Sequence, residues 1–138
     1  MYGNKFWIFV ENSRERIYEV NSENDEKVNG IEKSFGKWLL FFNWEESWEQ
    51  WKKIAIAVED GEMDSTQAKI SRQYEGNNYE KAVCCVYTSE KDIEIVREQL
   101  RKLGFNDQLC YKTNEATEQN SYGHASHLIC EKKNIEAD

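Results

Sequence analysis

The chain has 138 residues, 39% of them hydrophobic and 13% aromatic, and its 18 basic and 26 acidic side chains give a formal net charge of −8 at pH 7. A chain of this length forms one domain and buries about two thirds of its unfolded surface without help from disulfides. Five tryptophans argue against a disordered chain. The acidic balance disfavours non-specific binding to nucleic acid, although it is compatible with a local basic pocket for a small anion.

Residues 1–20 carry charges throughout and contain no continuous apolar segment, so we predict no signal peptide. No apolar run reaches the length of a membrane span, and we predict no membrane partner. The expected location is cytoplasmic. The absence of proline and the many Asn, Lys, Glu and Ile residues are typical of AT-rich bacterial or phage genomes. For a viral protein the location would be the host cytoplasm.

The first half of the chain contains strands and one long helix. Phe6–Val10 is a short apolar strand, and Gly36–Phe42 is apolar on both faces, which is typical of the centre of a sheet. Asn43 is the expected N-cap of the following helix, with Glu46 as its reciprocal partner. Apolar residues at 4-3-4-3 spacing then predict one buried stripe, formed by Trp44, Trp48, Trp51, Ala55 and Val58.

The second half continues the alternation of strands and helices. Gln67–Arg72 is a predicted strand, and the run from Lys81 to Thr88 is a second centre-of-sheet strand. Ser89 is the expected cap of a helix that ends at Gly104, with an apolar stripe of Ile93, Val96, Leu100 and Leu103. Two further strands are predicted at Leu109–Thr113 and His124–Cys130.

This order of elements predicts an α+β fold. We expect a single domain over residues 1–130 and a flexible acidic tail over residues 131–138. The sheet should be curved and mostly antiparallel, with the two main helices packed on one face. The opposite, concave face would then be left for a ligand or partner.

The cysteines and histidines give no sign of a cofactor. The cysteines form no CxxC pair, and we predict that all four are buried free thiols, at positions 84, 85, 110 and 130. Cys84 and Cys85 should point to opposite faces of their strand. His124 and His127 would also face opposite sides of a strand and have no suitably spaced third ligand, so we predict no metal and no other cofactor.

Five short segments in order carry a family resemblance: GKWLLFF (36–42), W..IA.AVEDG (51–61), AKIS (68–71), VCCVYT…D…VREQLRKLGF (83–105) and LCYKT…T…SY (109–122). Together they resemble the basophilic-leukaemia-expressed protein family, which is sometimes labelled a phosphothreonine lyase. The fold of that family is similar to the mRNA cap-binding translation factor, a curved antiparallel sheet backed by helices. The resemblance implies a concave face on which a nucleotide stacks on tryptophan and pairs its phosphates with Lys and Arg.

Candidate ligand-binding residues follow from that expectation. Trp7 and Trp44 stand near the ends of their elements, so they are better stacking candidates than the tryptophans expected in the core. Cations within strands, such as Lys69, would pair with a phosphate or carboxylate, although strand lysines are also commonly just solvated. The full predicted set is Trp7, Trp44, Lys69, Ser71, Arg72, Tyr111, Lys112, Thr113 and His127.

Three functions remain open on the sequence. The first is non-enzymatic binding of a nucleotide-like or phosphorylated small molecule, which in a virus would sequester a signalling nucleotide of the host. The second is an enzyme acting on a phosphate ester, with Lys69 or Lys112 as base and a histidine as acid, although no spacing supports catalytic residues. The third is a protein–protein adaptor that uses the aromatic-rich surface. A homo-oligomer also stays open.

Overall fold

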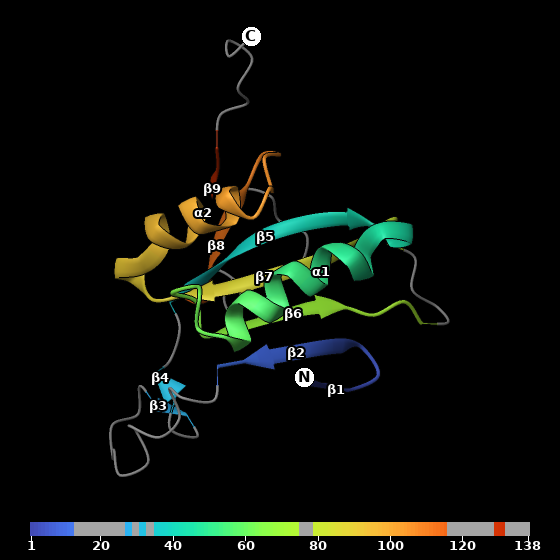
Figure 1. The fold of residues 1–138 in the computed structure, drawn as a ribbon, viewed down its shortest axis with the longest axis horizontal. Helices are drawn as coiled ribbons and strands as arrows, with labels where there is room; N and C mark the ends of the chain where they lie inside the picture. Colours follow the sequence, from blue (N-terminus) through green and yellow to red (C-terminus); the bar gives the residue numbers. More distant parts are fainter. Residues whose placement is uncertain (13–26, 29–30, 33–34, 75–78, 116–128, 132–138) are drawn as a thin grey trace, which may run out of the picture.

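The computed structural model describes residues 1–12, 27–28, 31–32, 35–74, 79–115 and 129–131. Within these residues seven strands form one open antiparallel sheet in the order β1-β2-β6-β7-β5-β8-β9, and β3 and β4 form a separate two-stranded ladder (Figure 1). The strands are β1 (Tyr2–Gly3), β2 (Trp7–Glu11), β3 (Lys27–Val28), β4 (Ile31–Glu32), β5 (Gly36–Asn43), β6 (Gln67–Ser71), β7 (Lys81–Thr88), β8 (Cys110–Thr113) and β9 (Ile129–Cys130). The helices are α1 (Trp44–Glu59) and α2 (Ile93–Lys102), with a 3-10 turn over Glu90–Asp92 before α2.

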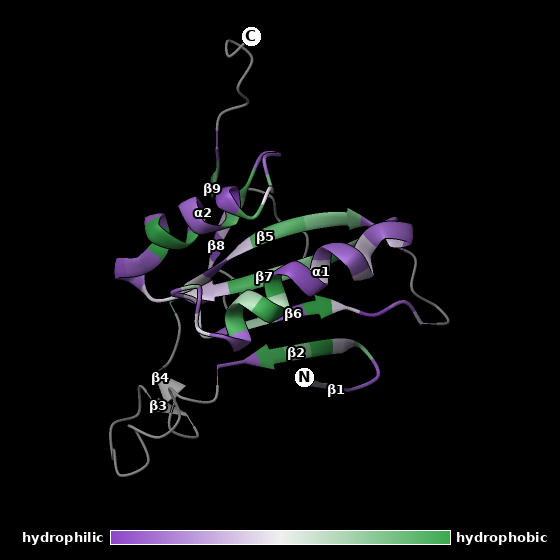
Figure 2. Cartoon of the chain, in the orientation of Figure 1, coloured by the Kyte–Doolittle hydropathy of each residue, from purple (hydrophilic) through white to green (hydrophobic). Residues whose placement is uncertain are grey.

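The two strands that are apolar on both faces lie in the middle of the sheet, as predicted, and the structure places them side by side. β5 and β7 pair along their whole length, from Gly36 opposite Thr88 to Asn43 opposite Lys81. Figure 2 shows hydrophobic residues along β5 and β7, and also along β6 and β2 of the same sheet. Burial on both faces therefore explains why these two segments lack the polar alternation of an exposed strand.

Both helices pack on the same face of the sheet, which confirms the predicted α+β arrangement. One cluster of buried side chains joins the elements: Trp51, Ile54 and Val58 of α1, Val96 and Leu100 of α2, and Trp38, Leu40 and Phe42 of β5. The Trp38 indole N–H also donates to the Ile93 carbonyl oxygen at 2.9 Å, which fixes the start of α2 against β5. Trp38 therefore lies in the core.

The apolar stripe of α1 differs from the prediction at Trp48. Trp51, Ala55 and Val58 are buried, but 49% of Trp48 is exposed. The centre of the buried stripe passes between Trp51 and Ile54, and Trp48 lies one turn away at its edge, because positions 48 and 54 flank Trp51 on opposite sides of the helix. The prediction that Trp48 belongs to the buried stripe is therefore wrong.

The predicted helix caps are correctly placed, but their side chains bond differently. Asn43 precedes α1, and its side-chain amide donates to the Glu46 carboxylate at 3.2 Å instead of accepting from a backbone N–H. Ser89 likewise donates to the Asp92 carboxylate at 3.0 Å and is followed by the 3-10 turn. Gly104 has φ +105°, the left-handed conformation expected where α2 ends.

Two of the four cysteine predictions are corrected. Cys84 and Cys85 are buried free thiols on opposite faces of β7, as expected. Cys110 and Cys130, however, form a disulfide between β8 and β9, where they are direct cross-strand partners. Two cysteines 20 residues apart meet because the β8–β9 ladder brings them opposite each other, and the sequence alone does not give that register.

Glu131 anchors the end of the described chain to α2. Its carboxylate accepts from the guanidinium groups of Arg97 and Arg101, and from the Leu109 backbone N–H at 2.9 Å. Burial acts to raise the pKa of Glu131, but the three donors outweigh it and hold that pKa below its ordinary value. The first residue of the predicted tail is thus fixed by charge-assisted hydrogen bonds.

Some predictions fall on other parts of the chain. Residues 132–138 of the predicted tail and residues 124–128 of the predicted last strand lie outside the described residues. The division into a 1–130 domain and a tail stays a prediction. In the part of the chain that the structure describes, neither helix is long and apolar enough to cross a membrane.

Candidate functional site

Three lysines from three strands lie on the side of the sheet that carries neither helix, which we call the helix-free face. Alternation along the strands places them there, because their neighbours Trp38, Ala68 and Tyr111 point into the helix-covered core. The three residues, which we call the lysine cluster, are Lys37 of β5, Lys69 of β6 and Lys112 of β8.

The register of the sheet sets the positions of these lysines. Lys37 lies directly opposite Lys112 on one side and opposite Tyr87 of β7 on the other. Lys69 lies opposite Cys85, which is two residues from Tyr87 on the same face of β7. Lys37 and Lys69 therefore flank Tyr87 and Cys85 from the two strands beside β7, and Lys112 lies next to Lys37 one strand further out.

Aromatic rings lie against two of the ammonium groups. The Lys69 Nζ lies 3.9 Å from the centroid of the Trp7 ring and 6.0 Å from that of Tyr87. The Lys37 Nζ lies 5.6 Å from the same Tyr87 ring, and it donates to the Asn114 side-chain oxygen at 3.3 Å. Tyr87 thus has one lysine from each of its two neighbouring strands, and both ammonium groups lie at distances at which an aromatic ring attracts a cation.

Electrostatic coupling links the cluster to Cys85. Lys37 is only 8% exposed although it is charged. Burial lowers the pKa of Lys37; Cys85 opposes this shift, and the charges of Lys69 and Lys112 add to it. Burial also raises the pKa of the Cys85 thiol, while the three lysines act to lower it. The site is therefore a concentration of positive charge in a chain whose net charge is −8.

The comparisons with known proteins agree with the resemblance seen in the sequence. Residues 8–120 match the family described as basophilic leukemia-expressed protein Bles03. This chain belongs to the Bles03 family. The matched region contains all three residues of the lysine cluster, whereas Trp7 lies just before it. A search of curated proteins finds no match. The predicted likeness of the Bles03 fold to the cap-binding factor stays a prediction.

The structure of this Bles03-family chain brings four of the nine predicted ligand-binding residues to the helix-free face. Lys69 and Lys112 are members of the lysine cluster, and the Trp7 ring lies against the Lys69 ammonium group. Ser71 lies opposite Trp7, and its hydroxyl oxygen accepts the Val83 backbone N–H at 2.9 Å. Ser71 therefore helps to hold β6 against β7 beside the cluster.

Two of the predicted residues face the other side of the sheet. Tyr111 is buried in the core against Trp38, and its hydroxyl shares a 2.8 Å hydrogen bond with the Thr88 hydroxyl. Thr113 is two residues further along β8 and therefore shares the core side of that strand. The sequence reading placed Lys112 and its two neighbours in one site, but a strand separates adjacent side chains onto opposite faces.

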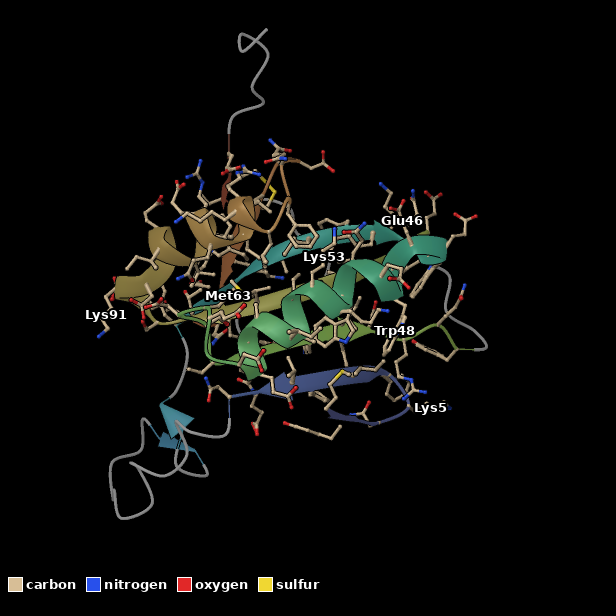
Figure 3. The ribbon with its side chains drawn as sticks, viewed as in Figure 1. Lys5, Glu46, Trp48, Lys53, Met63 and Lys91 are labelled. Carbon is tan, nitrogen blue, oxygen red and sulfur yellow. A yellow bond between two sulfur atoms is a disulfide. The ribbon has the colours of Figure 1, made fainter. Side chains whose placement is uncertain are left out.

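Trp44 and Arg72 belong to a different hollow. Together with Trp48, Trp51 and Ile70 they line a cleft of about 260 Å³ beside the start of α1. The Trp44 indole N–H donates to the Tyr79 carbonyl oxygen at 3.0 Å, and Arg72 donates to the Asn4 carbonyl oxygen at 3.3 Å. Figure 3 shows Trp48 on the side of α1 that faces β6 and β2. These two residues are not part of the lysine cluster.

Sequence reasoning missed Lys37 and Tyr87. Lys37 lies in the apolar segment GKWLLFF, where its position favours a buried side chain and gives no sign of a polar site. The useful signal was the parity of its position, because residues 37, 39 and 41 must share the face opposite to Trp38. His127 lies outside the described residues, as does His124. Within the described residues no group of three His, Cys, Asp or Glu side chains is arranged to hold a metal ion.

Proposed function

We propose that this chain binds a nucleotide-like or otherwise phosphorylated small molecule on the helix-free face and does not turn it over. One observation carries the proposal: three lysines from three strands lie on one face of the sheet, two of them near the Tyr87 ring and the third directly opposite Lys37, in a chain of net charge −8. A cluster of this kind is an attractive site for phosphate, because each lysine is a compact point charge with three donors.

The energetics of the unliganded cluster favour an anionic ligand. Like charges at directly opposite positions of a sheet destabilise it by up to about 1 kcal/mol, and Lys37 and Lys112 have this relationship. Burial of Lys37 adds a cost of desolvation. A phosphate between these side chains would offset both costs, so its binding free energy would include the relief of a strain that is already present.

The aromatic side chains offer a surface for a base. Stacking of a base on an aromatic ring contributes about 1–3 kcal/mol. Tyr87 and Trp7 lie beside the cluster, and both are half-buried. The Lys69 ammonium occupies one face of the Trp7 ring, so a base on Trp7 would use the other face. In a virus, binding without turnover would lower the free concentration of a host signalling nucleotide.

One observation favours the enzyme alternative. A general base must be deprotonated near neutral pH, and burial lowers the pKa of Lys37 in that direction. Lys37 was not among the bases considered from the sequence. It would take a proton from the carbon next to the ester carbon while the C–O bond to phosphate breaks, so that a C=C bond forms and inorganic phosphate leaves between Lys69 and Lys112. Product formation separates this alternative from binding alone.

A thermal-shift screen followed by chromatography tests the proposal. The panel contains cyclic dinucleotides, ADP-ribose derivatives, cap analogues and a phosphothreonine peptide. A ligand at about 100 times its dissociation constant adds about 2.7 kcal/mol of stability. We expect a hit that is recovered intact, and we expect it to weaken in Lys37→Met, Lys69→Met and Lys112→Met but not in the control Lys91→Met.

Each other outcome argues against the proposal in a specific way. Recovery of a changed ligand would establish the enzyme alternative. A hit that persists in all three cluster variants would place the site elsewhere. Absence of any thermal shift across the panel would rule out a nucleotide-like ligand and favour an adaptor role.

A further inference from the structure

Among the described residues, no strand lies beside half of one edge of β5. On its β7 side, β5 is paired over all eight residues from Gly36 to Asn43. On its β8 side, pairing covers only Gly36 to Leu39, where Leu39 lies opposite Cys110. Within the described residues, positions 40–43 therefore border no strand on the β8 side.

The alternation of the ladder shows which backbone groups face this open edge. In an antiparallel sheet, successive residues of a central strand direct their N–H and C=O groups to opposite neighbours. The Val83 N–H donates to the Ser71 hydroxyl oxygen on β6, so the odd-numbered residues of β7 face β6 and the even-numbered ones face β5. Even-numbered residues of β7 pair with even-numbered residues of β5, and the odd-numbered residues of β5 therefore face β8. Phe41 consequently directs its N–H and C=O to the open edge, and Asn43 directs its N–H there. Leu40 and Phe42 direct theirs to β7.

A cleft of about 550 Å³ lies along the same edge. It is bordered by β5, by the first turns of α1 and by the segment 104–109 that follows α2. Figure 3 shows Glu46 on the side of α1 away from Trp48, toward β5. The lining includes Phe41, Phe42, Glu46, Lys81, Phe105 and Asp107. Its size is that of an ordinary ligand site, but an open strand edge forms one of its walls.

We propose that this cleft binds an extended peptide segment of a partner protein, which adds to the sheet as a short strand beside residues 41–43 of β5. Addition of a strand to a sheet edge gains affinity from backbone hydrogen bonds and specificity from pockets for alternate side chains. The three backbone groups at Phe41 and Asn43 would supply the hydrogen bonds. This site is separate from the lysine cluster, and the proposal does not depend on the phosphorylated ligand.

The walls of the cleft indicate the chemistry of the peptide. Side chains of an added strand alternate between the two faces of the sheet. On the helix-free face they would meet Phe41, which is 51% exposed, and on the helix-covered face they would meet Phe42 and Phe105. Apolar side chains of the peptide would therefore fit on both faces of the sheet. Glu46 and Asp107 outnumber Lys81 at the rim, so a basic residue should be preferred over an acidic one.

Hydrogen exchange tests the open edge without any ligand. The amide of Phe41 should exchange much faster than the amides of Leu40 and Phe42, which are its immediate neighbours and are paired with β7. The three amides make a matched set, because they lie in one strand and report the same global stability. Protection of Phe41 equal to that of Leu40 would overturn the proposal, since the edge would already be paired.

The binding test selects peptides from a library of capped random hexapeptides. Each selected sequence is then resynthesised with alternate backbone nitrogens methylated, which removes the N–H donors of those residues. We expect selected peptides to carry a basic residue between apolar ones, to slow exchange at Phe41, and to weaken roughly tenfold or more on methylation, as loss of one or two hydrogen bonds requires. The double variant Glu46→Lys, Asp107→Lys should weaken binding, whereas Glu45→Lys, a neighbouring exposed position outside the cleft, should not.

The remaining results would contradict the proposal. Selection of no peptide, or equal affinity of the methylated peptides, would exclude strand addition. A concentration-dependent dimer in which the Phe41 amide becomes protected would assign the edge to a second copy of the chain instead of a partner peptide.

Discussion

Lys37 of β5 and Lys112 of β8 are direct cross-strand partners on the helix-free face. Two cations at opposite positions of a ladder repel each other, and a protein selected for stability alone would place an opposite charge or an apolar residue at one of them. The pair therefore marks a place where the sheet carries a cost that a bound anion would relieve.

Reversing one charge of this pair should separate stability from binding. Lys112→Glu is expected to raise the free energy of unfolding by about 0.2–1 kcal/mol, because it converts a repulsive cross-strand pair into an attractive one. The same variant should lose the phosphorylated ligand. Urea denaturation and the thermal-shift screen measure the two effects, and Lys91→Glu on the exposed surface is the control. If Lys112→Glu is less stable than the wild type and still binds the ligand, then Lys37 and Lys112 do not destabilise the sheet by repulsion and Lys112 does not bind the ligand.

Two tryptophans one turn apart on α1 should respond very differently to truncation. Trp51 is fully buried, so Trp51→Ala should lower the free energy of unfolding by about 3–5 kcal/mol. Trp48 is half exposed, and Trp48→Ala should lower it by clearly less, about 1–2 kcal/mol. Chemical denaturation followed by far-UV circular dichroism measures both. Equal losses would mean that the buried stripe of α1 includes Trp48 after all.

Glu131 should make the free energy of unfolding fall as the pH is lowered into the acid range. Its pKa is lower in the folded protein than in the unfolded chain, so its contribution is complete above the ordinary pKa of a glutamate and is lost as the pH falls through the lowered value. Glu131→Gln should cost about 2 kcal/mol at pH 7 through weakened bonds to the two arginines. It should also flatten the loss of stability on acidification. Glu94→Gln, whose side chain is 77% exposed, should change the free energy of unfolding at pH 7 by no more than about 0.5 kcal/mol.

Reduction of the Cys110–Cys130 disulfide should destabilise the fold. The bond closes a chain segment with a separation of 20 residues, for which the loss of unfolded-state entropy corresponds to about 3 kcal/mol. Denaturation with and without a reductant measures the difference. The double variant Cys110→Ser, Cys130→Ser should reproduce the reduced value and lose all sensitivity to the reductant. A reductant effect that survives in this variant would point to another thiol.

The sequence predicted the elements of this fold better than it predicted the candidate site. Period-2 and period-3.6 patterns depend only on neighbours along the chain, so β5, α1, β7 and α2 were found within a few residues of their observed bounds. The lysine cluster depends on which strands lie beside each other. Lys37 meets Lys112 only because β8 pairs with β5 across a separation of about 75 residues, and no local pattern contains that information.

The same limit explains the errors at single residues. Tyr111 was grouped with Lys112 by proximity in the sequence, although a strand places the two side chains on opposite faces. The Cys110–Cys130 bond required the register of β8 and β9. Trp48 was misplaced by the width of a helical stripe, because an apolar residue at its edge satisfies the period as well as one at its centre.

Within the residues that the structure describes, the outer strands β1 and β9 span two residues each, and these residues are exposed. Short outer strands give other chains little backbone to pair with, which is a common protection against aggregation into fibres. Such protection matters for a protein that would bind its ligand in a fixed ratio without turning it over. A binder that does not turn over its ligand must accumulate to at least the concentration of that ligand, and short outer strands would limit association at the two ends of the sheet at that concentration.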